Sequence, residues 1–269
     1  MIGAIIGDIV GSRFEFHNHK SKEFDLLADE SVITDDTVMT IAIADALLKA
    51  KDVDLSHIGD LAIDRMRYWG NQYLDVGYGG MFKNWLKSDN PMPYKSFGNG
   101  AAMRVSPCGI AATDEDMAEE LSYRVTMVTH NHLESVKAAE AVSLAILWAR
   151  KGYTKDSIQN KILLSYYPID FTLDEIRDKY RFDVTCQGSV PQAFEAFFAS
   201  VDFIDTIRNA VSIGGDSDTI ACIAGSMAWE YYKAQGELTD NDYSLWHECY
   251  RRIPSSLRTV VDEFIEEYE

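Results

Sequence analysis

Apolar residues recur along most of this chain every three or four positions, the spacing of a helix with one buried face. The pattern predicts helices at about residues 1–14, 34–50, 55–75, 81–86, 114–128, 132–151, 154–164, 172–179, 203–213, 219–236, 240–251 and 255–268. A further helix is expected to begin within residues 187–191, with Pro191 in its first turn. No segment alternates apolar and polar residues as a strand would, so the pattern predicts an all-α protein. We expect a single domain over residues 1–269.

The helix predicted over residues 1–14 is apolar enough to be buried. Gly3, Gly7 and Gly11 lie four residues apart on one of its faces and would let another helix approach closely. Asp8 is the charged residue in this apolar stretch. Its carboxylate needs a partner, which is either a hydrogen-bond donor or a metal site.

Two polar clusters have nearly the same build: T-D-D-T at residues 34–37 and G-G-D-S-D-T at residues 214–219. Each runs directly into an apolar helix, and the helix that follows Thr34 is apolar almost all round, which places it at the centre of the fold. Carboxylates and hydroxyls at a helix start accept unpaired backbone N–H groups and face the positive end of the helix dipole. Each cluster could be only a helix cap, but each has one aspartate more than a cap needs.

Together the two clusters could form a metal site. Mg²⁺ and Mn²⁺ prefer oxygen ligands, whereas zinc favours cysteine and histidine. Four carboxylates would repel each other without cations, and two divalent ions would neutralise them. We predict that the clusters face each other and hold divalent metal, with the cap-only interpretation as the alternative. The six oxygen-bearing side chains are those of Thr34, Asp35, Asp36, Asp216, Asp218 and Thr219.

Other polar positions carry weaker signals. Glu15 lies between two phenylalanines and is expected to be partly buried. The polar loop at residues 17–30 contains two histidines, which we expect to be exposed rather than ligands. The segment 98–104 combines small residues with Arg104 and could bind phosphate, although Asn-Gly is first of all a turn signal. On the residues alone, His130 is better interpreted as part of a capped turn.

Charge and cysteine usage narrow the class of protein. The chain has 25 basic and 43 acidic residues, a net charge of -18, and would repel nucleic acid and anionic membranes. Its four cysteines are far apart, which argues against a disulfide framework and fits a reducing cytosol. Neither a signal peptide nor a membrane span is predicted, so we expect a cytoplasmic protein.

In sequence order, five motifs resemble those of the ADP-ribosylglycohydrolase family, which includes the enzyme that removes ADP-ribose from dinitrogenase reductase. The resemblance extends nearly from end to end of the chain. The motifs are G-A-I-I-G-D at residues 3–8 with Gly11 and Glu15, residues 34–37, Gly98-Asn99-Gly100 with Met103, Arg104 and Pro107, T-H-N-H at residues 129–132, and residues 214–219 with Gly225.

This resemblance implies an orthogonal multi-helix bundle around a dinuclear magnesium centre, with Mn²⁺ as an alternative ion. It implies hydrolysis of the bond between C1 of the distal ribose and an acceptor, with ADP-ribose or an ADP-ribosylated molecule as the ligand. The six cluster residues carry over as metal ligands. The resemblance places Glu15 near the metals and ribose and moves His130 from a turn residue to the ligand site. Residues carried over to the phosphate- and ribose-binding loop are Gly98, Asn99, Gly100 and Met103.

Cleavage of a ribosyl bond builds positive charge at C1, which nearby carboxylates stabilise. Either Glu15 or Asp35 would take the proton of the attacking water, and both assignments stay open. Leu133 and Ser135 replace the Pro and Gly that the resemblance to close bacterial relatives leads us to expect. Residues 17–30 correspond to a segment that gates the substrate and varies in sequence among those relatives. The acceptor therefore does not carry over. Two alternatives remain: a non-catalytic ADP-ribose-binding or structural member, and a hydrolase of another ribosyl or nucleotide substrate.

Overall fold

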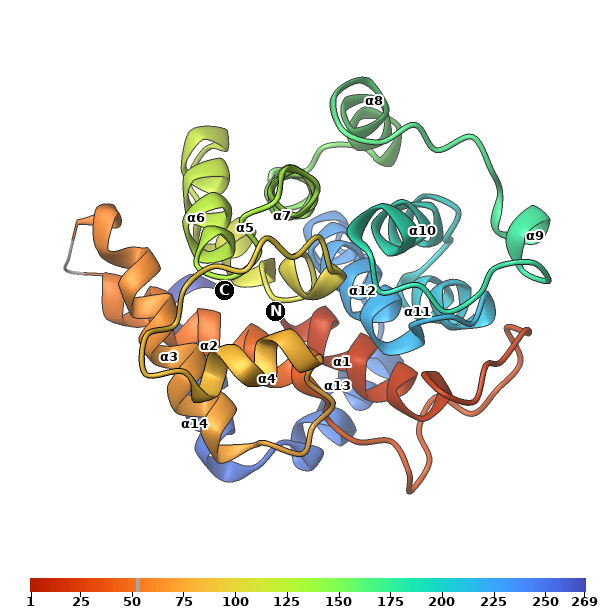
Figure 1. Cartoon of the computed structure of the whole chain (residues 1–269). Helices are drawn as coiled ribbons and strands as arrows, with labels where there is room; N and C mark the ends of the chain where they lie inside the picture. Colours follow the sequence, from red (N-terminus) through yellow and green to blue (C-terminus); the bar gives the residue numbers. More distant parts are fainter. Residues whose placement is uncertain (52–53) are drawn as a thin grey trace.

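The computed structural model describes residues 1–51 and 54–269, and it is built of α-helices around a central pair, α1 (Ile2–Gly11) and α12 (Ser217–Gln235) (Figure 1). Within the described residues there is no strand, apart from an isolated bridge between Gly98 and Thr185. The predicted all-α class is therefore confirmed. The other helices are α2 (Asp35–Ala50), α3 (Ile58–Gln72), α4 (Gly80–Lys87), α5 (Ser106–Ala111), α6 (Glu115–Met127), α7 (Leu133–Arg150), α8 (Lys155–Ser165), α9 (Leu173–Ile176), α10 (Cys186–Phe198), α11 (Phe203–Ser212), α13 (Asp240–Arg252) and α14 (Ser255–Tyr268).

The observed helices differ from the predicted ones in three places. Helix α5 was not expected, because its six residues are too few to show a period. Helix α9 is one short turn rather than the longer helix predicted at residues 172–179. The placement of Pro191 in a first turn was wrong. Helix α10 begins earlier, because the Thr185 side chain accepts the Gly188 N–H (3.1 Å) and caps it, so Pro191 lies in the second turn.

Glycine makes the contact between α1 and α12 a backbone-to-backbone one. A Cβ atom added to Gly7 would lie 2.0 Å from the Ala221 carbonyl oxygen, and one on Gly3 would lie 2.0 Å from that of Gly225. A Cβ on Gly11 would lie 2.5 Å from the Asp218 Cα. The predicted close approach is confirmed, and it sets the end of α1 against the acidic start of α12.

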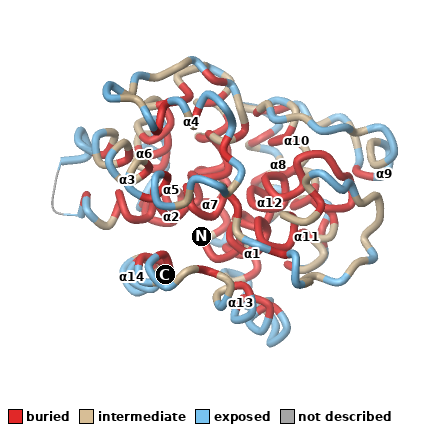
Figure 2. The backbone as a smooth tube through the Cα atoms, turned by 60° about the horizontal axis from the view of Figure 1, so that its bottom comes forward, coloured by how far each residue is buried: buried red, intermediate tan, exposed pale blue. Residues whose placement is uncertain are grey.

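Burial is concentrated in the helices that surround this contact. Figure 2 shows α1, α2, α7 and α12 as mainly buried, with the exposed backbone at the periphery. Helix α2 lies at the centre, as its all-round apolar sequence predicts. Its N-cap is Thr34, whose hydroxyl accepts the Asp36 N–H (3.2 Å). The first turns of α2 and α12 are both largely buried, so packing in the core holds the starts of both helices in place.

Substitution of Gly7 by alanine tests the α1–α12 contact. The added methyl group would collide with the backbone of Ala221, so the free energy of unfolding should fall by about 3 kcal/mol. The matched control is Gly59→Ala in α3, where the nearest atom to an added Cβ is 3.5 Å away. That variant should stay within about 1 kcal/mol of the wild type in urea unfolding. Equal stability of both variants would contradict the close contact.

Candidate active site

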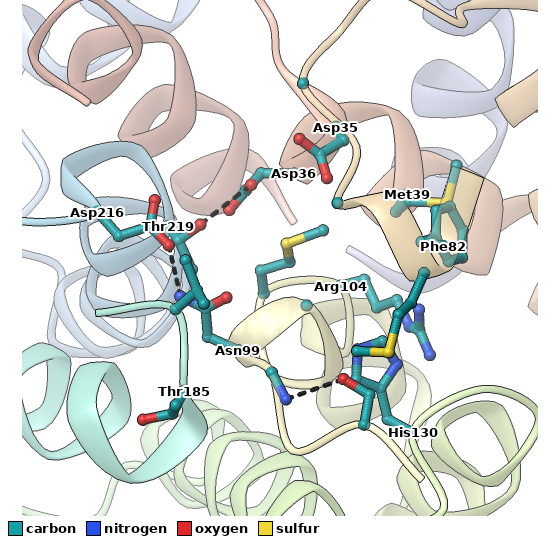
Figure 3. Close-up of a pocket in the computed structure, with 18 of the residues that line it drawn as sticks. Asp35, Asp36, Met39, Phe82, Asn99, Arg104, His130, Thr185, Asp216 and Thr219 are labelled. Carbon is teal, nitrogen blue, oxygen red and sulfur yellow. Dashed lines mark hydrogen bonds between the residues drawn. The ribbon is translucent and has the colours of Figure 1, made fainter. Parts of the chain in front are cut away.

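A cavity of 780 Å³ opens where the starts of α2 and α12 meet (Figure 3). The residues that line it come from segments far apart in the sequence. All the sequence-predicted site residues except Thr34 line it. They are Glu15, Asp35, Asp36, Gly98, Asn99, Gly100, Met103, His130, Asp216, Asp218 and Thr219.

The two acidic clusters face each other at one end of this cavity. The Thr219 hydroxyl donates to Oδ2 of Asp36 (3.2 Å) and so joins the start of α12 to that of α2 (Figure 3). Carboxylate oxygens of Asp8, Asp36 and Asp218 lie within 4.8 Å of one another. Those of Glu15, Asp216 and Asp218 form a second such group. Both groups could hold a metal ion.

Asp8, a member of the first group, is held by hydrogen bonds from the start of α2. Its carboxylate accepts the Thr34 N–H (3.0 Å), the Thr34 hydroxyl (2.7 Å) and the Thr37 N–H (3.1 Å). The partner that the sequence requires for Asp8 is thus this set of donors. Thr34 does not line the cavity, and its hydroxyl proton is directed to Asp8. One lone pair of its oxygen accepts the Asp36 N–H (3.2 Å), and the other remains free for a metal ion.

The second cluster depends on a glycine turn. Gly214 and Gly215 have φ values of 65° and 79°, in the left-handed region that favours glycine. Asp216 then occupies the N-cap position of α12 without making a capping bond. Its Oδ2 accepts instead from the Asn99 amide (2.6 Å), which also donates to the Ser189 hydroxyl (3.0 Å). Asp216 is thus turned toward the cavity rather than toward its own helix.

Burial makes this end of the cavity costly for negative charge. It raises the pKa values of Asp36 and Asp218 well above the usual range, and neighbouring carboxylates add to the effect. Burial, followed by the charges of Asp8 and Asp216, raises the pKa of Asp35 to about 8, and burial raises that of Glu15 to about 7. Oδ1 of Asp36 is buried and has no hydrogen-bond partner. An unpaired carboxylate oxygen among crowded carboxylates fits a divalent cation.

The opposite wall contains the loop at residues 98–103 and His130 (Figure 3). The Thr129 hydroxyl is hydrogen-bonded to Nδ1 of His130 (2.7 Å) and accepts from Arg104 (2.6 Å). Burial lowers the pKa of His130 well below its usual value, so its imidazole is neutral. Arg104 also donates to the Val125 carbonyl (3.2 Å), so its guanidinium holds this turn in place.

Exposed apolar residues form a rim that sequence reasoning missed. Phe16 and Phe182 stack with ring centroids 6.0 Å apart and are 74% and 44% exposed. Phe97, Val184 and Met81 also line the cavity and are exposed. The available signal was the presence of large apolar residues in otherwise polar loops.

The polar loop after Glu15 is only partly as expected. Glu15 itself is half-buried, as predicted, although Phe14 is buried and Phe16 is exposed. His17 is exposed, whereas His19 packs between two phenylalanine rings and bonds to a backbone carbonyl. Neither histidine lines the cavity.

Fold and site together define an all-helical protein with a ligand cavity that ends on an acidic, metal-compatible cluster. This chain belongs to the ADP-ribosylglycohydrolase family, whose model matches residues 1–236, and it is a hydrolase of that family. The motifs that carried the resemblance all fall within the matched region, so the family prediction is confirmed.

Several known proteins are similar to this chain. ADP-ribosylarginine hydrolase Tri1 of Pseudomonas putida is 26% identical, with 88% of this chain and 70% of the relative aligned. ADP-ribosylhydrolase ARH3 of Xenopus tropicalis is 25% identical, with 86% and 85% aligned. A solved ADP-ribosylglycohydrolase-related protein complex matches 98% of this chain and 96% of its own, with a TM-score of 0.67 at 21% identity, which supports the fold.

None of the described helices combines the length and apolar character needed to cross a membrane.

Removal of divalent cations should make stability fall as pH rises. Carboxyl groups with raised pKa values keep their protons in the folded state after the unfolded chain has lost them. The folded state therefore loses stability between about pH 4 and about pH 8, the interval between the ordinary value and that of Asp35. Thermal unfolding in a chelator should show a lower midpoint at about pH 8 than at about pH 5.

Excess Mg²⁺ should raise the midpoint most at the alkaline end of this range, because the ion binds the charged carboxylates. An Asp35→Asn variant should show a smaller pH effect in the chelator. A midpoint that does not depend on Mg²⁺ at any pH would contradict a metal site here.

Proposed function

We propose that this chain is a Mg²⁺-dependent hydrolase that cleaves the bond between C1 of a ribose and an acceptor, and releases ADP-ribose. The observation that carries the proposal is the meeting of two acidic helix starts at the end of a 780 Å³ cavity. The relatives support it, because the P. putida protein is an ADP-ribosylarginine hydrolase and the X. tropicalis protein an ADP-ribosylhydrolase.

The proposed ligands of two Mg²⁺ ions, with Mn²⁺ as an alternative, are the six oxygen-bearing side chains of the clusters. When bound, the ions would neutralise the carboxylates, fix ribose hydroxyls and lower the pKa of an attacking water. Asp8 orients Thr34 by accepting its hydroxyl proton. Thr219 keeps Asp36 in place through its own hydroxyl. The ligands are Thr34, Asp35, Asp36, Asp216, Asp218 and Thr219.

Glu15 is the better of the two candidate bases. Its carboxylate lies beside those of Asp216 and Asp218, and it is not one of the six proposed ligands, so it stays available to accept a proton from a water held there. A pKa of about 7 in the cation-free protein matches a proton acceptor that works near neutral pH. Glu15 directly precedes Phe16 of the exposed rim, so water can reach its carboxylate from the mouth of the cavity. Asp35 then serves as a metal ligand.

The loop at residues 98–103 and His130 would hold the ribose and phosphates. Gly100 lies against His130, since a Cβ atom there would be in van der Waals contact with Nε2 of His130 (3.4 Å). Asn99 connects this wall to the acidic end through its bond to Asp216. The proposed binding residues are Glu15, Gly98, Asn99, Gly100, Met103 and His130. A cytoplasmic location is also proposed, supported by four buried cysteines that form no disulfide.

Replacement of Asp216 by alanine should abolish turnover and weaken metal binding. Loss of a carboxylate that serves both the ions and the developing charge should lower ADP-ribose release by at least about 100-fold. Chromatography of released ADP-ribose, with Mg²⁺ and with a chelator, measures the effect. Asp174→Ala is the control, because this aspartate is 88% exposed and forms an ion pair with Arg177 one turn away. An unchanged rate in Asp216→Ala would contradict the metal-centre proposal.

A panel of ADP-ribosylated acceptors separates the remaining functions. Arginine, serine, nucleic-acid base and O-acetyl linkages should each be tested, and at least one should yield ADP-ribose in the presence of Mg²⁺. Binding of ADP-ribose without release from any acceptor would favour a non-catalytic member of the family. Release of a ribosyl or nucleotide product other than ADP-ribose would favour a hydrolase with a different substrate.

A further inference from the structure

Three segments without helical structure contact one another near the acidic end of the cavity. They are residues 15–20, residues 180–183 and the turn at residues 213–216, which ends in Asp216. The first carries the proposed base and the last carries a proposed metal ligand. The contact between α1 and α12 brings the first and last segments near each other, and side-chain contacts then hold residues 16–20 and 180–183 against the turn.

Lys20 joins all three segments. Its ammonium donates to the carbonyl of Tyr180 (3.0 Å) and to the carbonyl of Ile213. Ile213 follows the last turn of α11, so the cation also faces the negative end of that helix. One side chain therefore holds two carbonyl groups that belong to different segments.

The place where Lys20 meets the Tyr180 and Ile213 carbonyl groups is called the junction below. Asn18, Gly214 and Gly215 pack closely at this junction. Oδ1 of Asn18 accepts the Gly215 N–H. A Cβ atom on Gly214 would lie 2.4 Å from Oδ1 of Asn18 and 3.0 Å from Nζ of Lys20. One on Gly215 would lie 2.2 Å from the Tyr180 ring. The turn before Asp216 is thus enclosed by the other two segments.

Residues 15–20 and residues 180–183 also meet at the rim of the cavity. Phe16 follows Glu15 directly, and it stacks on Phe182. Tyr180 is fixed in turn, because its hydroxyl donates to the Gly188 carbonyl in α10 (2.7 Å). The chain that follows Glu15 is therefore tied twice to residues 180–183, by Phe16 at the rim and by Lys20 at the Tyr180 carbonyl.

We propose that Lys20 is a positioning residue, which holds the chain after Glu15 against the turn before Asp216 by binding the carbonyl groups of Tyr180 and Ile213. This proposal rests on the proposed function for its effect on catalysis, but the junction itself does not. Lys20 is not among the described residues that line the cavity. Its loss should therefore affect the reacting geometry more than the binding of ADP-ribose.

Lys22 provides a matched control two residues further along the same loop. Its ammonium pairs with Asp205 of α11, and its side chain is 40% exposed. Lys22→Met removes this ion pair to α11 and leaves the contacts of Lys20 with Tyr180 and Ile213 in place. Lys20→Arg keeps a donor that can reach the carbonyl groups, and Lys20→Met removes it.

The experiment combines steady-state kinetics with hydrogen exchange of the unliganded proteins. Lys20→Met should lower kcat by about 100-fold and change KM much less. Its amide exchange should rise in residues 15–20, 180–183 and 213–216 together. Lys20→Arg should recover most of both properties, and Lys22→Met should behave as the wild type. An unchanged kcat in Lys20→Met, or an equal loss in Lys22→Met, would overturn the proposal.

Hydrogen exchange separates this proposal from the proposed function. If the wild-type chain releases no ADP-ribose from any acceptor, the proposed function fails, but the exchange pattern still decides whether Lys20 holds the junction. A rise confined to residues 15–20 would overturn the positioning role, because residues 180–183 and 213–216 would then not depend on Lys20.

Discussion

The contact between α1 and α12 determines where the acidic groups can be. Glycine on α1 allows the two backbones to touch at Ala221 and Gly225, and near Asp218 a side chain on Gly11 would have no room. The end of α1 is therefore fixed against the start of α12. Asp8 on α1 then reaches the start of α2, where it accepts bonds from Thr34 and Thr37. One helix pair thus brings two distant helix starts to the same point.

The cost of this arrangement is the burial of like charges. Asp8, Asp36, Asp216 and Asp218 are all buried, and burial raises the pKa of each. Backbone N–H groups, hydroxyls and the Asn99 amide offset part of that cost. They leave one oxygen of Asp36 unpaired. The proposed ions would complete the neutralisation, so that stability and activity both depend on the same carboxylates.

Local sequence signals predicted the helices and the paired clusters but not the long-range contacts of the loops. Periodic segments such as α2 and α7 were predicted closely, because apolar spacing reflects burial directly. The two helix starts were paired on their chemistry, since each carried more acid than a cap requires. Contacts such as Phe16 with Phe182, or Lys20 with Ile213, join loops without any period. Their geometry depends on the assembled fold, so no local pattern indicates them. Helix α5 could not be predicted because its six residues make fewer than two turns, and periodicity is recognised only over several turns.

The central claim is that the starts of α2 and α12 together hold divalent cations. Diffraction from crystals grown with Mn²⁺, recorded at a wavelength where manganese scatters anomalously, tests it most directly. The account predicts two anomalous peaks between Asp36 and Asp218, one on the Asp35 side and one on the Asp216 side. A map with ordered aspartates and no peak between them would contradict it.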